Sequence, residues 1–243
     1  MNKDETIDFV LAGQNIKFKY PNSEFEKNIV LLNFNGYDYP IIPLYGYQPS
    51  VIIDIGAHIG STALYFHAHY PAASVYAFEP NIYNYRYLHE NTKYFEKIVT
   101  FQHGLFDKEI EVPLYSGKDN SGQSSVMKSN YAETISEIIR LKKASEEIKK
   151  LNIEKISILK IDTEGCEIPV LKDIAPMIKD IDIIYLEYHS EDDRLEIDQM
   201  LTPDFFLYFS RASGIHQGVI TYISKKLAKN FKGIEHSKIT RNF

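Results

Sequence analysis

The 243-residue sequence predicts an α/β fold, a mostly parallel sheet with helices on both faces. From Val51 onward, apolar segments too short for helices, several of them rich in β-branched residues, alternate with stretches that favour helix. This βαβα order is typical of buried parallel strands joined by covering helices. The predicted strands are 51–55, 74–78, 98–102, 156–161 and 183–187, and the predicted helices are 61–70, 82–95, 133–151 and 167–178.

Antiparallel strands are predicted towards the two ends of the chain. Apolar and polar residues alternate in 7–11 and 16–20 around a turn at 13–15, which predicts a hairpin that covers one edge or end of the sheet. Residues 1–48 are therefore expected to form a β-rich extension packed on the core, and 49–243 a single domain. Segments 205–210 and 219–224 predict an antiparallel pair that closes the sheet.

Between these parts, a short strand is predicted at 110–115. The polar, glycine-containing segment that follows predicts a surface loop over 116–130, long enough to act as a lid or a substrate loop.

The bulk composition narrows the class of protein. With 44% hydrophobic residues and a net charge of −6, the chain is expected to bury a core and fold alone. It offers no run of about 20 apolar residues and no apolar signal core near Met1, so a cytoplasmic protein is expected. Cys166 is the only cysteine, which excludes zinc clusters built on paired cysteines. A pI near 5.8 disfavours a nucleic-acid partner held by a basic surface.

The strongest motif follows the strand 51–55, where a glycine-containing turn opens a helix and predicts a ligand cradle. Gly56 and Gly60 lie four residues apart, and Asp54 precedes them, whereas nicotinamide cofactors require G-x-G-x-x-G. A carboxylate there would repel a pyrophosphate but suits a cation, such as the ammonium of a methionine group. The residues assigned to the cofactor in this turn are Asp54, Gly56, Ala57, His58, Gly60 and Ser61.

A second acid follows the next predicted strand, 19 residues after Gly60. Glu79 is placed to accept the two hydroxyls of an adenosine ribose, and Pro80 and Asn81 are assigned to the cofactor with it. Glu79 is also explained as an acid at a helix N-terminus, with Pro80 starting the helix. That alternative leaves Asp54 and the glycines unexplained.

Five segments taken in order resemble the successive motifs of FkbM-type methyltransferases over about residues 50–190. His58 departs from the pattern, because the family usually has asparagine there, and the predicted helix 133–151 looks extended. The five segments are 54–60 (DIGAHIG), 78–81 (FEPN), 104–107 (GLFD), 159–165 (LKIDTEG) and 186–189 (LEYH).

The resemblance implies a Rossmann-like, seven-stranded sheet with a reversed last strand and S-adenosylmethionine bound at the carboxyl ends of the strands. It also implies O-methylation of a hydroxyl on a sugar or another small molecule. Gly104 and Leu105, which follow the third strand, are expected to pack against the adenine.

Methyl transfer to a poorly acidic hydroxyl needs alignment and a group that removes a proton. Candidates follow two strands that are expected to be neighbours: Asp162 and Glu164 after one, Glu187 and His189 after the other. His189 is the first choice for general base, with a solvated loop residue as the alternative. Asp162, which is also assigned to the cofactor, and Glu164 are candidates to orient the acceptor, fix the histidine or hold a divalent cation, although no metal ligand is assigned. Cys166 is expected to be a buried hydrophobe rather than a nucleophile.

Two other functions stay open. An RNA methyltransferase is disfavoured by the acidic charge and by the lack of an Asn-Pro-Pro-Tyr segment to hold a flipped base. A module that binds S-adenosylmethionine or a nucleotide without catalysis would keep the same motifs. The sequence assigns neither the acceptor nor the oligomeric state.

Overall fold

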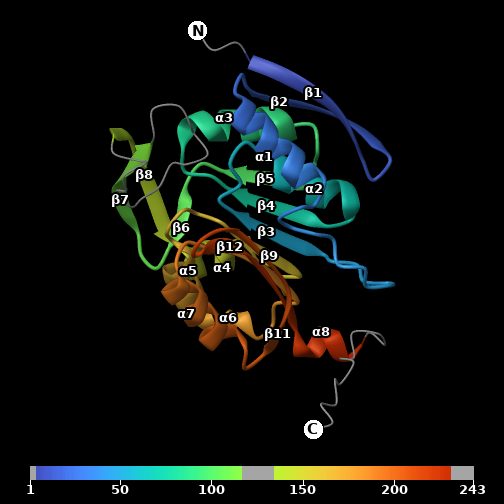
Figure 1. The fold of residues 1–243 in the computed structure, drawn as a ribbon, viewed down its shortest axis with the longest axis vertical. Helices are drawn as coiled ribbons and strands as arrows, with labels where there is room; N and C mark the ends of the chain where they lie inside the picture. The colour runs from blue at the N-terminus through green and yellow to red at the C-terminus, as the bar shows by residue number, and fades with distance from the viewer. Residues whose placement is uncertain (1–3, 117–133, 231–243) are drawn as a thin grey trace.

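Seven strands form the central sheet of the computed structural model, which describes residues 4–116 and 134–230 (Figure 1). All neighbouring strands are parallel except β12, which runs antiparallel to both of its neighbours. This order confirms the Rossmann-like α/β class, the reversed last strand and the antiparallel closing pair. In spatial order the strands are β11 (Phe205–Gly214), β12 (Gln217–Ser224), β10 (Ile183–Tyr188), β9 (Ile158–Ile161), β3 (Val51–Ile55), β4 (Ser74–Phe78) and β5 (Ile98–Phe101).

The sheet is covered on both faces, which is why its inner strands are apolar almost throughout. In Figure 1 one layer of helices lies above the sheet and the other below it. No helix among the described residues has the length and apolar character needed to cross a membrane. The upper layer contains α1 (Glu24–Phe34), α2 (Ser61–His69) and α3 (Ile82–Thr92), and the lower one contains α4 (Ala144–Lys150), α5 (Glu167–Asp173), α6 (Ala175–Ile178) and α7 (Glu191–Leu201).

The N-terminal hairpin is confirmed as β1 (Asp4–Leu11) and β2 (Gln14–Pro21), but its place differs from the expectation. It is a separate two-stranded sheet that packs on the upper helices rather than on an edge or end of the central sheet. Helix α1, which the sequence analysis did not predict, follows directly, and the Ser23 side chain accepts the N–H of Glu26 at its start. Phe34 at its end packs against rings of both hairpin strands, each at 5.2 Å between centroids.

The predicted helix over 133–151 is wrong. The described part of this stretch is a strand, β8 (Thr134–Lys143), followed by the short α4. Within β8, Ile139 and Leu141 are buried while Ile138 and Arg140 are exposed, a period of two that belongs to a strand. β8 joins β6 (Gly104–Phe106) and β7 (Ile110–Ser116), the strand before it in the chain, in a second sheet of order β6-β8-β7, and this pairing fixes its conformation.

One further helix differs from its prediction, and one predicted loop is not tested. The predicted helix 167–178 is divided into α5 and α6 at Ile174. The loop predicted over 116–130 lies outside the described residues from 117 onward.

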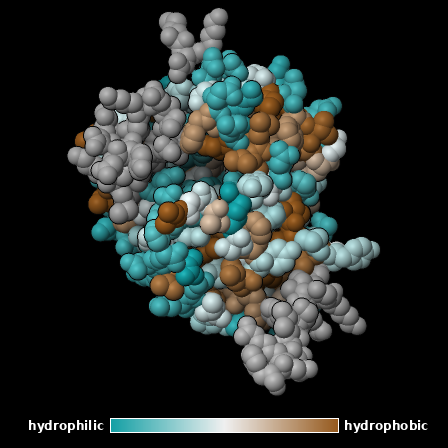
Figure 2. All heavy atoms as spheres, viewed as in Figure 1, coloured by the Kyte–Doolittle hydropathy of each residue, from teal (hydrophilic) through white to brown (hydrophobic). Residues whose placement is uncertain are grey.

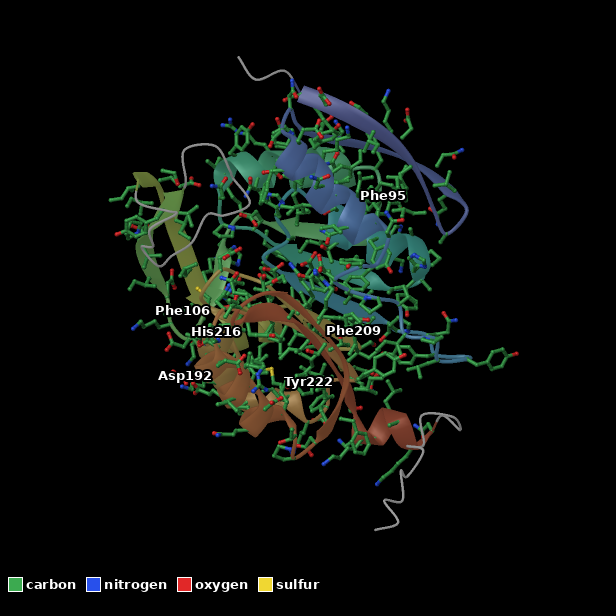
Figure 3. The ribbon with its side chains drawn as sticks, in the orientation of Figure 1. Phe95, Phe106, Asp192, Phe209, His216 and Tyr222 are labelled. Atoms are coloured by element: carbon green, nitrogen blue, oxygen red, sulfur yellow. The ribbon has the colours of Figure 1, made fainter. Side chains whose placement is uncertain are left out.

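The reversed strand β12 is tied to the lower helices by a buried tyrosine. Tyr222, labelled in Figure 3 on β12, is fully buried, and its hydroxyl donates a hydrogen bond to Asp198 on α7. Helix α8 (Lys225–Lys229) follows β12, with the Ser224 side chain accepting the N–H of Leu227 at its start. The sheet therefore ends in an antiparallel pair whose inner strand is hydrogen-bonded to α7.

Candidate functional site

The turn after β3 is shaped by close contact with the end of β9. Gly56 has φ +79°, and the N–H groups of Gly56 and Ala57 both donate to the carbonyl of Phe78 at 3.0 Å. A Cβ on Gly56 would lie 1.7 Å from the carbonyl oxygen of Asp162. Gly60 has φ +94°, a left-handed backbone that favours glycine, and a Cβ there would lie 3.0 Å from the Leu88 side chain. Packing thus explains Gly56 and backbone conformation explains Gly60, whereas the sequence analysis explained both by the approach of a ligand.

Glu79 follows β4 and holds this turn in place. Its Oε2 accepts the N–H of His58, and its Oε1 accepts the N–H of Asn81, both at 2.9 Å. Burial raises the pKa of Glu79 to about 7, although the two backbone N–H groups oppose the shift. His58 has φ +50°, a left-handed conformation in which Asn, Asp and His are enriched, so it can replace the asparagine usual in the resembling family.

Asp54 on β3 has a partner that the sequence analysis missed. Lys160 lies opposite it on β9, with 3.1 Å between Nζ and Asp54 Oδ1, and also donates to the carbonyl of Gly56 at 2.6 Å. Asp54 and Lys160 are both buried, and burial raises the pKa of Asp54 even though the lysine opposes it. A lysine inside the apolar segment 158–161 was the available signal for this pair.

The two acids fit the polar ends of S-adenosylmethionine. Ile55 lies opposite Phe78 in parallel register, so Asp54 and Glu79 stand at adjacent strand ends, close enough for the charge of Asp54 to raise the pKa of Glu79. Asp54 Oδ2 is buried and has no hydrogen-bond donor among the described residues, and each Glu79 oxygen accepts one hydrogen bond from that part of the chain. Carboxylate oxygens have about two acceptor sites each, so the ammonium and the ribose hydroxyls of such a cofactor find acceptors here.

The remaining residues assigned to the cofactor surround this turn, and several already have partners. Asn81 is the N-cap of α3, since its Oδ1 accepts the N–H of Asn84 at 2.9 Å. Ser61 is buried at the start of α2. Gly104 faces the side chains of Leu141 and Pro80. Leu105 is buried in the lower core, and its contact with an adenine remains a prediction.

Three carboxylates meet at the ends of β9 and β10, as the adjacency of these strands predicts. Asp162, Glu164 and Glu187 each place an oxygen within 4.8 Å of the others, a spacing that a cation can also bridge. Burial raises the pKa of Glu187 well above its usual range, and the charge of Asp162 adds to the shift. For Asp162 the burial effect is outweighed by Lys160, so its pKa lies below the usual value. The pair therefore shares one proton, held mainly by Glu187.

His189 lies among these acids. Its Nε2 is 3.7–3.9 Å from carboxylate oxygens of Glu187, Glu167 and Glu164, which makes ion pairs rather than hydrogen bonds. Burial lowers the pKa of His189, but the neighbouring acids, Glu167 foremost, raise it to about 9. The imidazole therefore keeps its proton at neutral pH, contrary to the premise on which the sequence analysis chose it as general base.

The turn that carries Glu164 is fixed by Glu167, another residue that the sequence analysis missed. Glu167 accepts hydrogen bonds from the N–H and hydroxyl of Thr163, both at 2.7 Å, and from the N–H of Gly165 at 3.0 Å. Glu164 has φ +57° in this turn, and burial raises its pKa to about 7. Cys166 is buried, which raises its pKa to about 12 and agrees with an inert hydrophobe.

The surface near the site has a hydrophobic area and a hollow. Figure 2 shows hydrophobic residues over α1, and a hollow beside this helix next to the carboxyl ends of β4 and β5. A separate cavity of about 380 Å³ lies between the hairpin and α3, lined by Lys17, Asn91 and Tyr94 among others. That cavity is lined by none of the acids described above, so it is separate from the strand ends that carry them.

Comparison with known proteins identifies the family. The family model described as the methyltransferase FkbM domain matches residues 54–214, well over half of the chain. The chain belongs to the FkbM methyltransferase domain family. The match begins at Asp54 and includes both the Glu79 segment and the carboxylate cluster, which confirms the resemblance seen in the sequence.

Individual relatives of this FkbM-family chain are distant. It is 32% identical to the AMB antimetabolite synthetase AmbE of Pseudomonas aeruginosa over 59% of the chain and 8% of AmbE. Identity is 27% to the methyltransferase sdnD of Sordaria araneosa, over 51% of the chain and 60% of sdnD. For the hexuronic acid methyltransferase AglP of Haloferax volcanii it is 24%, over 64% and 62%. The chain spans less than two thirds of each of these relatives.

Solved structures show weaker likenesses. Aeropyrum pernix fibrillarin with natively bound S-adenosyl-L-methionine is 14% identical, with a TM-score of 0.47 over 90% of this chain and 82% of that one. M. capricolum TrmK with S-adenosyl-homocysteine is also 14% identical, with a TM-score of 0.44 over 72% and 62%. At these scores the strand order remains the better guide to the fold.

Proposed function

We propose that this FkbM-family chain is an S-adenosylmethionine-dependent methyltransferase that methylates a hydroxyl of a sugar or another small molecule. The observation that carries the proposal is the pair of buried acids, Asp54 and Glu79, at adjacent strand ends. Asp54 would face the amino-acid end of the cofactor and Glu79 its ribose. The net charge of −6 and the relative AglP, a hexuronic acid methyltransferase, favour a small acceptor over RNA.

The cofactor supplies an electrophilic methyl group, and the residues of the chain align and deprotonate the acceptor. Glu164 is the most suitable base, because its pKa of about 7 lets it take a proton at neutral pH. Protonated His189, 3.9 Å from Glu164, would stabilise the ionised form of that base and help hold the acceptor. Asp162, with its pKa below the usual value, stays ionised beside the positively charged end of the cofactor.

Isothermal titration calorimetry tests the cofactor assignment. The wild-type chain is expected to bind S-adenosylmethionine and S-adenosylhomocysteine, and not NAD. Glu79→Gln should weaken that binding by roughly 10- to 100-fold, because a hydrogen bond to a charged group is lost. Glu90→Gln, an exposed acid on α3, is the matched control and should change nothing. Binding of NAD alone would overturn the proposal.

Transfer itself is tested with methyl-labelled S-adenosylmethionine and separate pools of sugars, other small hydroxyl compounds and RNA. Label is expected in the sugar or small-molecule pool. Glu164→Gln should lower transfer by about 10²–10⁴-fold with little change in cofactor affinity if Glu164 is the base. Label in RNA alone would favour the RNA methyltransferase, and binding without transfer to any pool would favour the silent module.

A further inference from the structure

Part of the N-terminal extension contacts the site at residues assigned to the cofactor. Helix α1 and the residues after it precede the matched range 54–214. The Asn33 side-chain amide donates to the Ser61 hydroxyl at 2.8 Å, and this hydrogen bond is buried. The Glu26 carboxylate, 2% exposed, lies 3.4 Å from His58 Nε2. Two points of the cofactor turn are thus held from outside the matched domain.

The third contact reaches the carboxylate cluster. The hydroxyl of Tyr39 donates to Asp162 Oδ2 at 2.6 Å, a short hydrogen bond to a charged acceptor. The ring is buried against Tyr185, edge to face at 5.9 Å, and lies under Lys160, whose Nζ is 5.6 Å from the ring centroid. Packing on these sides fixes the direction in which the hydroxyl points.

The chemistry of Tyr39 makes it a permanent donor. Burial raises its pKa well above 10, and the neighbouring Asp162 adds to the shift, so the phenol keeps its proton throughout the working range of an enzyme. Asp162 therefore accepts a hydrogen bond from one side while Lys160, 3.5 Å away, attracts the same Oδ2 oxygen. Asp162 also shares a proton with Glu187, so its carboxylate is held by three neighbours.

We propose that residues 24–39 are part of the cofactor site, and that Tyr39 and Asn33 are positioning residues that orient Asp162 and Ser61 for binding S-adenosylmethionine. The inference rests on the proposed function, since it assigns these residues to the same cofactor. It also moves the functional boundary, because residues 49–243 would not make a complete site without α1 and Tyr39.

Tyr47 provides a matched control on the same N-terminal segment. Its hydroxyl donates to the carbonyl of Ser157 at 3.2 Å and to Asp182 at 3.3 Å, away from the residues assigned to the cofactor. Tyr39→Phe and Tyr47→Phe each remove one hydroxyl that is hydrogen-bonded to a carboxylate and keep the ring, which is buried for Tyr39 and half-buried for Tyr47. Comparison of the two separates an effect on the site from a general loss of stability.

The experiment is calorimetric titration of the full chain with S-adenosylhomocysteine, together with thermal melting of each variant without ligand. Tyr39→Phe is expected to weaken binding about 10- to 100-fold, and Tyr47→Phe less than about twofold, although both lower the melting temperature. As a second pair, Asn33→Ala should weaken binding by a similar factor, whereas Asn35→Ala, which loses an exposed hydrogen bond to Leu31, should not.

The outcomes distinguish the two proposals. If the wild-type chain binds and the Tyr39 and Asn33 variants bind as tightly as their controls, the proposed function stands and this inference is overturned. If the wild-type chain does not bind S-adenosylhomocysteine at all, both are overturned. A fall in melting temperature without a change in affinity would assign Tyr39 a structural role only.

Discussion

Replacement of Lys160 by methionine would remove the cation that lies between Asp54 and Asp162. The Nζ atom lies 3.1 Å from Asp54 and 3.5 Å from Asp162, and its side chain is 2% exposed. Breaking a buried ion pair from one side costs roughly 3–5 kcal/mol, because the remaining charge loses its partner. At about 2–4 °C per kcal/mol for a chain of this size, the melting temperature is expected to fall by roughly 6–20 °C.

The loss of stability in Lys160→Met should depend on pH. Without Lys160, burial would raise the pKa of Asp54 further, and at low pH the carboxyl becomes neutral and needs no partner. The pKa of Lys160 itself is raised, so its contribution in the wild-type chain is complete well below its unfolded pKa of about 10.4 and does not change between pH 5 and 8. Lys160→Met is therefore expected to destabilise the fold more at pH 8 than at pH 5.

Urea unfolding followed by circular dichroism at the two pH values measures this difference. Lys226→Met is the control, because Lys226 pairs with Asp180 at 2.9 Å and both side chains are more than half exposed. It should cost about 0–1 kcal/mol, as surface ion pairs do. A loss below about 1 kcal/mol for Lys160→Met, or an equal loss at both pH values, would refute the assignment of a buried charge pair.

Three further predictions follow from the same geometry. Gly56→Ala should destabilise the fold by more than Gly46→Ala, since both glycines have φ +79° but only at Gly56 would a Cβ meet a backbone oxygen. Denaturant unfolding measures the two free energies of unfolding, and equal decreases would contradict the packing explanation. The affinity for S-adenosylhomocysteine should fall about tenfold from pH 8 to pH 5.5, because the pKa of Glu79 is about 7 and its ionised form accepts the ribose hydroxyls. Calorimetry should find a smaller fall in affinity for Glu79→Gln. An equal fall for that variant would assign the pH dependence to another group. EDTA should leave that affinity unchanged, since Lys160 and protonated His189 already supply positive charge to the acids, and a loss restored by Mg²⁺ would show that the acids bind a cation.

The central sheet could be predicted because its signals are local. Each strand of the parallel core is a short apolar segment, as Ile52 and Ile158 illustrate. Such a segment can be recognised without knowing which strand lies beside it. β8 was misread because its partners β6 and β7 come from elsewhere in the sequence, and the charged residues around Ile139 also suit a helix. Helix α1 was overlooked although Ser23 offered a capping signal.

The site was predictable where a residue is tied to a strand end and unpredictable where it depends on tertiary contacts. Asp54, Glu79 and Asp162 follow directly from strand positions. Tyr39 reaches Asp162 across 123 residues of sequence, so no local pattern could reveal it. The choice of His189 as base relied on an unperturbed imidazole, whereas its ionisation is set mainly by Glu167 on α5 and Glu164 in the turn before it, which only the fold brings close.

A crystal structure of the full chain with S-adenosylhomocysteine tests the central assignment most directly. Both ribose hydroxyls are expected within about 2.6–3.0 Å of the Glu79 carboxylate, with the amino-acid end of the ligand towards Asp54 and Asp162. A ribose elsewhere, with Glu79 bonded only to the N–H groups of His58 and Asn81, would contradict it.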